Sequence, residues 1–336
     1  QSFINGTQNL IFGANSAPLK EGRIASVQSI SGTGALRIGF EFIKAHFPRT
    51  MYISNPTWLN HPTMVERAGL KSVEYVYYNP QTKAVDIKGM ISSLEKAEPG
   101  SVVLLHACAH NPTGVDPTQE DWKQICEVMK KNSLFPFFDS AYQGFASGDL
   151  DKDAWAIRYF IDQGFQMFVA QSFAKNMGLY GERIGAFHIV CASKDTKEKV
   201  LSQIKPIVRQ NYSNPPLHGA RIADRILNNP ANFEAWKKEL KDVANRIIEM
   251  RTVLRKRLES LKTPGTNRNN LGTWSHITSQ IGMFSYTGLN EKQCDILVKK
   301  YHVYLLRSGR ISMAGINSKN VGYLAESIKA CIEEAK

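Results

Sequence analysis

The feature that most constrains the fold is the alternation of short apolar segments with amphipathic ones between residues 51 and 190. The apolar segments are rich in β-branched and aromatic residues and are as short as ordinary strands. Stretches with helical periodicity, such as residues 119–131, separate them. This alternation predicts a doubly wound, mainly parallel α/β sheet. The predicted strands are MYISN (51–55), EYVYY (74–78), SVVLLHAC (101–108), FPFFDS (135–140), MFVAQSF (167–173) and GAFHIV (185–190).

The second half of the chain has a different organisation. The chain has 336 residues, 43% of them hydrophobic, which suits roughly two domains at about 150 residues each. After the N-P-P stretch at 214–216, a long charged amphipathic run predicts a connecting helix. Strands are then expected in GMFSYTG (282–288), VYLLRSG (303–309) and GRISMAG (309–315), and a closing helix over 321–334. The predicted units are a large domain (1–232), a connecting helix (233–262) and a small α+β domain (263–336).

Composition and charge argue against several classes of protein. Lys and Arg number 42 against 30 Asp and Glu, a net charge of +12, but the basic residues are scattered. Small anions are therefore the preferred ligands, and no nucleic acid is expected. Apolar stretches end well short of the roughly 20 residues that cross a bilayer, so no membrane partner is expected. Five widely spaced cysteines, an odd number, indicate a reducing compartment.

Several polar residues follow the predicted strands, where parallel sheets bind their ligands. The S-G-T-G stretch at 31–34 precedes a helical segment, so it suits a phosphate site, with a plain helix cap as the alternative. Asp139 ends a strand and needs a cationic partner unless it only caps a helix. His106, Cys108 and His110 would share one strand face, but no second ligand pair has a suitable spacing. We therefore expect no metal, and a buried, hydrogen-bonded His106.

Lys175 is the strongest candidate for chemistry. It follows an apolar run, and a lysine amine held against buried surface near other cations becomes nucleophilic enough to form a Schiff base. Ser172 lies three residues before it and Arg183 eight after it, which supplies a hydroxyl and a guanidinium for one phosphate. The alternative is a solvated surface lysine, and this constellation argues against it.

Eight stretches resemble the aspartate aminotransferases, a family of fold-type I enzymes that depend on pyridoxal 5′-phosphate. They occur in the family's order and cover essentially the whole chain. The resemblance implies an α/β large domain with a mainly parallel, seven-stranded sheet, and a smaller α+β C-terminal domain. The stretches are SGTGALRIG (31–39), NPTWLNH (55–61), HACAHNPTGVDPT (106–118), FFDSAYQGFASG (137–148), QSFAKNMGLYGERIGAF (171–187), YSNPP (212–216), QIGMFSYTGL (280–289) and SGRISMAG (308–315).

The resemblance also implies a role for each matching residue. Lys175 would form the Schiff base with the cofactor and then move a proton at the substrate α-carbon, while Asp139 would keep the ring nitrogen of the cofactor protonated. His61 and His106 would orient Asp139. The other cofactor contacts would come from Tyr142 and Asn111 at the phenolic oxygen, Trp58 over the ring face, and Ser31, Gly32, Thr33, Ser172 and Arg183 around the phosphate.

Two arginines would select the substrate, next to Trp58 and Asn111. Arg310 would bind the α-carboxylate, and Arg209 would reach from the partner subunit of a homodimer to a distal carboxylate. The pair implies dicarboxylates, and hence reversible, ping-pong transfer of the amino group from aspartate to 2-oxoglutarate. A broader enzyme that also accepts aromatic amino acids is one alternative, and a catalytically incomplete binding or assembly protein is another.

The sequence departs from the family in two places. From the family we expect roughly seventy to eighty further residues before Gln1, and with them an arm that clasps the neighbouring subunit, part of the small domain and a tyrosine that one subunit lends to the phosphate of the other. A polar insertion, residues 267–272, is expected to be a surface loop without catalytic consequence. The pI near 9.4 favours the mitochondrial branch, whereas phrases such as AWAIRYF favour the cytoplasmic one. We expect a cytoplasmic location, with the mitochondrial matrix as the alternative.

Overall fold

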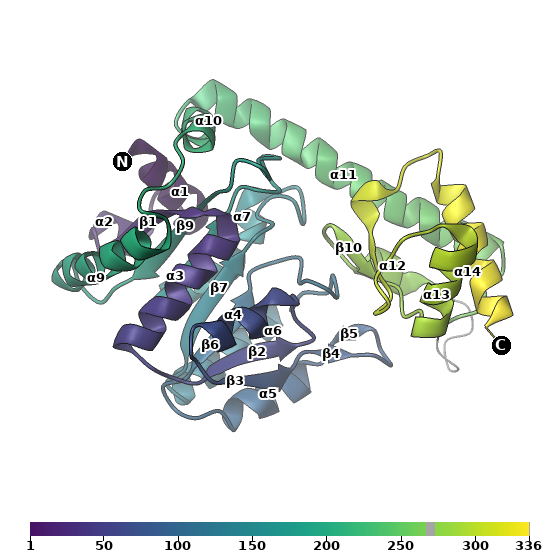
Figure 1. The fold of residues 1–336 in the computed structure, drawn as a ribbon, viewed down its shortest axis with the longest axis horizontal. Coiled ribbons are helices and arrows are strands. Elements are labelled where there is room, and N and C mark those ends of the chain that lie inside the picture. Colours follow the sequence, from purple (N-terminus) through teal and green to yellow (C-terminus); the bar gives the residue numbers. More distant parts are fainter. Residues whose placement is uncertain (267–272, 336) are drawn as a thin grey trace.

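The computed structural model describes residues 1–266 and 273–335. Its centre is a seven-stranded sheet with the order β1-β9-β8-β7-β6-β2-β3 (Figure 1). Six strands run in the same direction, and β9 alone is antiparallel to its two neighbours, β1 and β8. The expected mainly parallel sheet is confirmed. The strands are β1 (Ile24–Ile30), β2 (Met51–Asn55), β3 (Ser72–Val76), β6 (Val102–His106), β7 (Phe135–Ser140), β8 (Met167–Ser172) and β9 (Ile184–Val190).

Helices cover both faces of this sheet (Figure 1). One face packs against α3, α4 and α9, and the other against α1, α5, α6 and α8. In β7, Phe137 is buried on the first side and Phe138 on the second, because successive side chains of a strand point to opposite faces. The helices are α1 (Ser2–Phe12), α2 (Ala17–Lys20), α3 (Ser31–His46), α4 (Asn60–Arg67), α5 (Ile87–Glu95), α6 (Gln119–Lys131), α7 (Leu150–Asp153), α8 (Trp155–Asp162), α9 (Lys194–Tyr212) and α10 (His218–Leu227).

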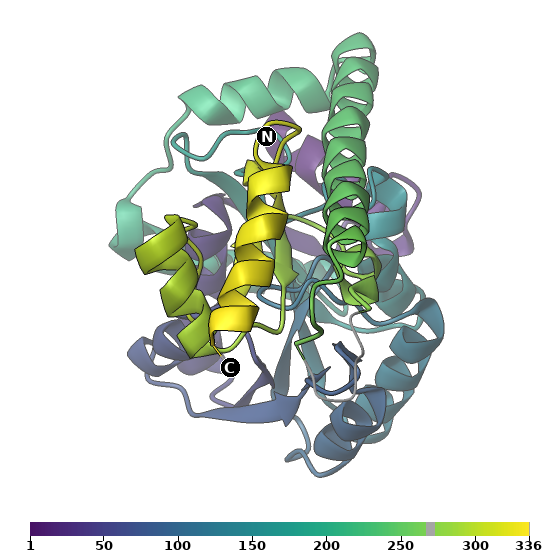
Figure 2. The same ribbon diagram turned by 90° about the vertical axis from the view of Figure 1, so that its right-hand side faces the viewer.

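A helix of 31 residues, α11 (Pro230–Ser260), leads from the large domain into the small one (Figures 1 and 2). Asn229 caps its start by accepting a hydrogen bond from the Asn232 N–H, and Pro230 occupies the first position, where its missing N–H costs nothing. At the other end Lys262 takes a left-handed φ of 52° and turns the chain away. The expected connecting helix is present. Its start and end signals place it two to three residues earlier than the predicted range of 233–262.

The small domain contains α12 (Ser275–Ser279), β10 (Phe284–Tyr286), α13 (Glu291–Tyr301), β11 (Arg310–Ser312), the short 3₁₀ turn η1 (Met313–Gly315) and α14 (Val321–Glu334). β10 and β11 form an antiparallel pair, which confirms two of the three predicted strands. The prediction of a strand over 303–309 is wrong. The side chains of this segment alternate between half-buried and exposed up to Leu306, but the Leu306 N–H bonds to the Arg310 carbonyl and closes a turn instead of joining a sheet.

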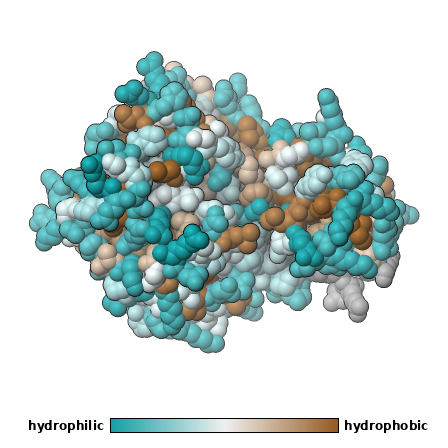
Figure 3. Space-filling model, in the orientation of Figure 1, coloured by the Kyte–Doolittle hydropathy of each residue, from teal (hydrophilic) through white to brown (hydrophobic). Residues whose placement is uncertain are grey.

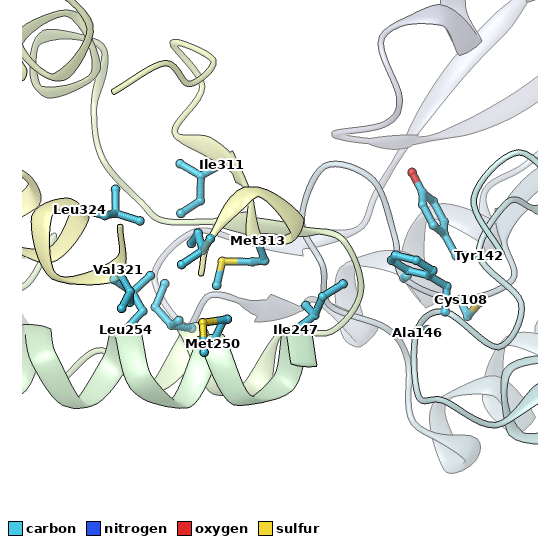
Figure 4. Close-up of a cluster of buried hydrophobic side chains, with 14 of the residues drawn as sticks. Cys108, Tyr142, Ala146, Ile247, Met250, Leu254, Ile311, Met313, Val321 and Leu324 are labelled. Atoms are coloured by element: carbon cyan, nitrogen blue, oxygen red, sulfur yellow. The ribbon is translucent and has the colours of Figure 1, made fainter. Parts of the chain in front are cut away.

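One hydrophobic core runs through both domains. It contains residues of the small domain and α11 together with Cys108, Tyr142 and Ala146 of the large domain (Figure 4). A large-domain hairpin, β4 (Tyr78–Asn79) with β5 (Ala84–Val85), also meets the small domain, where the Tyr78 ring packs on Tyr286. In the space-filling view, apolar residues gather along the junction of the two lobes (Figure 3). Within residues 1–266 and 273–335, no helix is both long and apolar enough to span a membrane.

Candidate active site

A cavity of about 340 Å³ opens where the carboxyl ends of β6, β7 and β8 meet the start of α3. Residues of the small domain contribute to its wall through Phe284 and Arg310. The structure brings together here every residue predicted for the site except Arg209. The predicted residues that line the cavity are Ser31, Gly32, Thr33, Trp58, Asn111, Asp139, Tyr142, Ser172, Lys175, Arg183 and Arg310.

The start of α3 forms one end of the cavity. Ser31 has a φ of 57°, and its N–H donates a hydrogen bond of 3.0 Å to the Arg183 carbonyl. No side chain caps the start of α3, which leaves N–H groups of its first turn for an anionic ligand. The Ser31 and Ser172 hydroxyls lie 3.0 Å apart. A Cβ on Gly32 would lie 3.2 Å from the Ser172 Cβ, and one on Gly185 would lie 2.6 Å from the Ser31 carbonyl carbon. The glycines therefore permit the close approach of α3 to β8 and β9 that makes an anion cradle.

Lys175 lies just after β8, half-buried beside Tyr142. Its Nζ is 5.2 Å from the centre of the Tyr142 ring. Burial lowers the pKa of Lys175, the Asp139 carboxylate raises it, and the Arg183 guanidinium lowers it. The net pKa lies below the ordinary value of lysine, so more of the amine is present in its neutral, nucleophilic form.

Asp139 is the penultimate residue of β7 and is 8% exposed. Its Oδ2 lies 3.1 Å from His61 Nε2, and the Thr57 hydroxyl contacts both His61 Nδ1, at 2.8 Å, and His106 Nε2, at 3.2 Å. Burial alone would raise the pKa of Asp139, but the hydrogen bond with His61 and the nearby Lys175 amine hold this pKa below its usual value. Asp139 is therefore an ionised carboxylate at neutral pH, aimed into the cavity.

The histidines near β6 are hydrogen-bonding groups. Burial lowers the pKa of His106 to about 3, with His61 adding to the effect and Asp139 opposing it, so His106 is neutral. His110 bonds to Ser54 and Thr113 on its two ring nitrogens. No group of three or more His, Cys, Asp or Glu side chains among the described residues could hold a metal ion.

Arg310 reaches the cavity from β11, where it pairs with Tyr286 of β10. Its guanidinium carbon lies 4.1 Å from the centre of the Phe284 ring, and its NH1 donates a hydrogen bond of 2.8 Å to Asn111 Oδ1. Burial lowers the pKa of Arg310. This contact fixes a flat, cationic fork at the cavity wall, which is the geometry that a carboxylate requires.

Arg209 lies outside this cavity. It is exposed in the last turn of α9, and its NH1 donates a hydrogen bond of 2.6 Å to the Ser213 hydroxyl. The position is that of a residue facing outward from its own chain. Its predicted role in a neighbouring subunit stays a prediction.

The charge balance of the cavity wall favours anionic ligands. It contains three cationic side chains, Lys175, Arg183 and Arg310, and one carboxylate, Asp139. None of the three cations forms a salt bridge with a carboxylate of residues 1–266 or 273–335. The cavity can therefore accept two negative groups.

Two aromatic residues that line this cavity, Tyr180 and Phe284, are not among the predicted site residues. In the sequence, Phe284 is only part of a predicted strand, and Tyr180 is only one position of a stretch that resembles the family. The polar insertion at 267–272, predicted as a surface loop, lies outside the described residues.

Comparison with known proteins places these features in a family. The sequence pattern described as "Aminotransferase class I and II" matches residues 1–328. The chain belongs to the class I and II aminotransferases.

Three characterised relatives show how close the similarity is. A protein named "Aspartate aminotransferase, cytoplasmic" from Oryza sativa subsp. japonica is 51% identical over 97% of this chain and 79% of its own length. The structure of aspartate aminotransferase from Saccharomyces cerevisiae cytoplasm has a TM-score of 0.96 and 43% identity, over 100% of this chain and 82% of that one. An aromatic-amino-acid aminotransferase from Burkholderia pseudomallei, covalently bound to pyridoxal phosphate, has a TM-score of 0.93 and 40% identity, over 98% of this chain and 81% of that one.

Proposed function

We propose that this chain is an aspartate aminotransferase, which transfers the amino group of L-aspartate to 2-oxoglutarate and yields oxaloacetate and L-glutamate. The observation that carries the proposal is the single cavity that joins an anion cradle, a lysine of lowered pKa, a buried ionised carboxylate and an arginine fork. The aspartate aminotransferases of rice and yeast, similar over nearly the whole chain, support the choice of substrate.

The residues of the cavity fit pyridoxal 5′-phosphate. The α3 start, the Ser31 and Ser172 hydroxyls and Arg183 offer donors to a phosphate. A Cβ on Gly185 would displace the Ser31 backbone of this cradle, and one on Gly32 would crowd Ser172. Lys175 and the ionised Asp139 line the same cavity, which allows one group to contact an amine and a carboxylate together. Asn111 and Tyr142 supply further hydrogen-bonding groups to the cavity, and Trp58 supplies an aromatic face.

When bound, pyridoxal phosphate supplies an electron sink for the bond-breaking at the substrate α-carbon. Lys175 would hold the cofactor covalently and, once released, accept and return a proton at that carbon. Its lowered pKa favours the neutral amine that this task requires. Asp139, held by His61, would keep a proton on the ring nitrogen, because an ionised carboxylate in a buried site stabilises an adjacent cation.

Arg310 would bind the α-carboxylate of the substrate through its fork. Arg209 would meet the distal carboxylate across the interface of a homodimer, so that each active site is shared between two subunits. The exposed position of Arg209, away from the cavity of its own chain, supports this arrangement. Small dicarboxylate amino and oxo acids are then the preferred substrates.

The domain bounds and the compartment are also part of the proposal. We propose a large domain over 1–232, a connecting segment over 233–262 that holds most of α11 (Pro230–Ser260), and a small domain over 263–336. We also propose that the enzyme is cytoplasmic. The cytoplasmic relatives from rice and yeast support this compartment.

A broader aminotransferase that also accepts aromatic amino acids is the second candidate. The similarity to the aromatic-amino-acid aminotransferase of Burkholderia pseudomallei favours it. Measuring kcat/KM for aspartate and phenylalanine side by side, each with 2-oxoglutarate, separates the two. We expect a strong preference for aspartate, and equal values would establish the broader enzyme.

A further inference from the structure

Arg251 is a buried cation without an ionic partner among the described residues. It lies on α11, is 1% exposed, and forms no salt bridge with any carboxylate in the described part of the chain. Its neighbours one turn away on the helix, Ile247 and Leu254, are buried apolar residues of the shared core (Figure 4). Burying a charge in such surroundings is expensive, so its compensating contacts indicate what it does.

Those contacts are three backbone carbonyls of one small-domain segment. NH1 of Arg251 donates to the Ile277 carbonyl at 3.0 Å, and NH2 donates to the carbonyls of Gly282 and Phe284 at 2.8 and 2.6 Å. The guanidinium therefore fastens the whole stretch from α12 to the first residue of β10. Its Nε has no hydrogen-bond partner among the described residues, so all of its hydrogen bonds there come from the two terminal nitrogens.

The same segment presses against the active-site loop of the large domain. The Ile281 N–H donates to the Gly114 carbonyl at 2.7 Å. A Cβ on Gly282 would lie 2.5 Å from the Ala109 Cβ, and one on Gly114 would lie 2.8 Å from the Phe284 carbonyl oxygen. The segment is thus held between α11 and the loop that carries Asn111.

The fastened segment in turn sets the place of the substrate fork. Phe284 begins β10, and the pairing of β10 with β11 positions Arg310. The Phe284 ring lies under the Arg310 guanidinium, and Asn111 accepts its hydrogen bond. A displacement of the Phe284 backbone would therefore move both the ring and the strand on which Arg310 depends.

We propose that Arg251 is a positioning residue for substrate carboxylate recognition: by fastening the carbonyls of Ile277, Gly282 and Phe284 it holds Phe284 and Arg310 in the geometry that binds the α-carboxylate. This inference rests on the proposed function. Arg251 acts only through other residues, since it does not line the cavity. An arginine suits the task because its two terminal nitrogens reach separate acceptors, whereas a lysine presents its donors from one point.

The first test compares Arg251→Lys with Arg255→Lys in the holoenzyme. Arg255 lies one turn further along α11 and contacts the Thr278 side chain but none of the three carbonyls, so it is the matched control. We expect Arg251→Lys to raise KM for aspartate and for alanine by the same factor, on the order of tenfold or more, because small misplacements of a binding group are costly. The kcat should change much less. Arg255→Lys should leave both KM values within about twofold.

Binding without turnover provides an independent reading. The Kd of succinate, which has carboxylates but no amino group, should rise in Arg251→Lys by a factor similar to KM when measured by calorimetry. Thermal unfolding of each variant shows whether the fold is kept. An unchanged Kd and KM in a folded Arg251→Lys protein would overturn the positioning role, whereas absence of aspartate turnover and succinate binding in the unmodified protein would instead refute the proposed function.

A double-mutant cycle separates positioning from general stability. Once Arg310→Lys has removed the fork, Arg251→Lys should weaken succinate binding little further, because it acts through the same group. Additive losses in the double variant would show that Arg251 acts elsewhere and would overturn the inference.

Discussion

At the scale of single residues, Asp139 shows how burial and hydrogen bonding produce a specific charge state. Its carboxylate is nearly enclosed, yet it stays ionised because His61 bonds to it and the Lys175 amine lies nearby. An ionised carboxylate in this place can hold a proton on a bound ring nitrogen.

Replacing Asp139 tests that role. A charge pair about 4 Å apart at an effective dielectric of 20 is worth on the order of 4 kcal/mol, so Asp139→Ala should slow proton removal from aspartate by about a thousandfold. Single-turnover kinetics at saturating cofactor measure this step. Asp139→Glu keeps the charge and should retain much more of the rate. A normal single-turnover rate in Asp139→Ala would refute the assigned role.

The two arginines should differ in what they recognise. A hydrogen bond to a charged group contributes roughly 1.5–3 kcal/mol, so Arg209→Ala should lower kcat/KM for aspartate by about a hundredfold or more. Alanine lacks the distal carboxylate and should be nearly unaffected, whereas Arg310→Ala should harm both substrates. Steady-state kinetics with the two amino acids measure this. Equal losses for aspartate and alanine in Arg209→Ala would contradict its assignment.

At the scale of elements, β9 holds a histidine that should govern acid stability. His188 is fully buried and bonds to Ser26 of β1 and Gln171 of β8, and burial lowers its pKa from 6.5 to about 3. Between pH 6.5 and about pH 3, His188 is therefore protonated in the unfolded chain and neutral in the folded chain. The stabilising effect is complete above about pH 6.5 and is lost progressively toward pH 3.

A variant isolates this contribution. Denaturant unfolding at several pH values should show a decline in the free energy of unfolding below pH 6.5, to which His188 adds about 1.4 kcal/mol per pH unit. His188→Gln should be shallower by that amount. Ser26→Ala removes a partner of the same ring but keeps the titrating group, so it should lose stability without losing the slope. An unchanged slope in His188→Gln would show that the ring is not held neutral.

The sequence predicts the sheet, the connecting helix and most of the cavity, because short continuous apolar runs, helical periodicity and family stretches are local signals. It does not predict β1, whose polar members Ser26, Gln28 and Ser29 interrupt the apolar pattern, nor the outcome at 303–309. A strand needs a partner, and pairing is decided far away in the chain. For the same reason Arg251, which fastens a distant segment, gives no sign of its role in the sequence.

At the scale of the whole molecule, the proposed homodimer shares each active site between two subunits. If Arg209 acts across the interface, Lys175→Ala and Arg209→Ala proteins are each inactive toward aspartate, but a mixed dimer of the two contains one intact site. Random reassortment should restore about a quarter of the normal activity, because half of the dimers are mixed and half of their sites are intact. Activity that stays at the level of the separate variants after verified subunit exchange would contradict a shared site.

The proposed function makes Lys175 essential for the transfer of the amino group from aspartate to 2-oxoglutarate. The most direct measurement supplies ¹⁵N-aspartate and 2-oxoglutarate to the holoenzyme and follows the label by mass spectrometry. We expect ¹⁵N-glutamate and oxaloacetate in equal amounts, and nearly none of either from Lys175→Ala, which lacks the nucleophilic amine. Label that remains in aspartate with the unmodified enzyme, or equal transfer by Lys175→Ala, would contradict the claim.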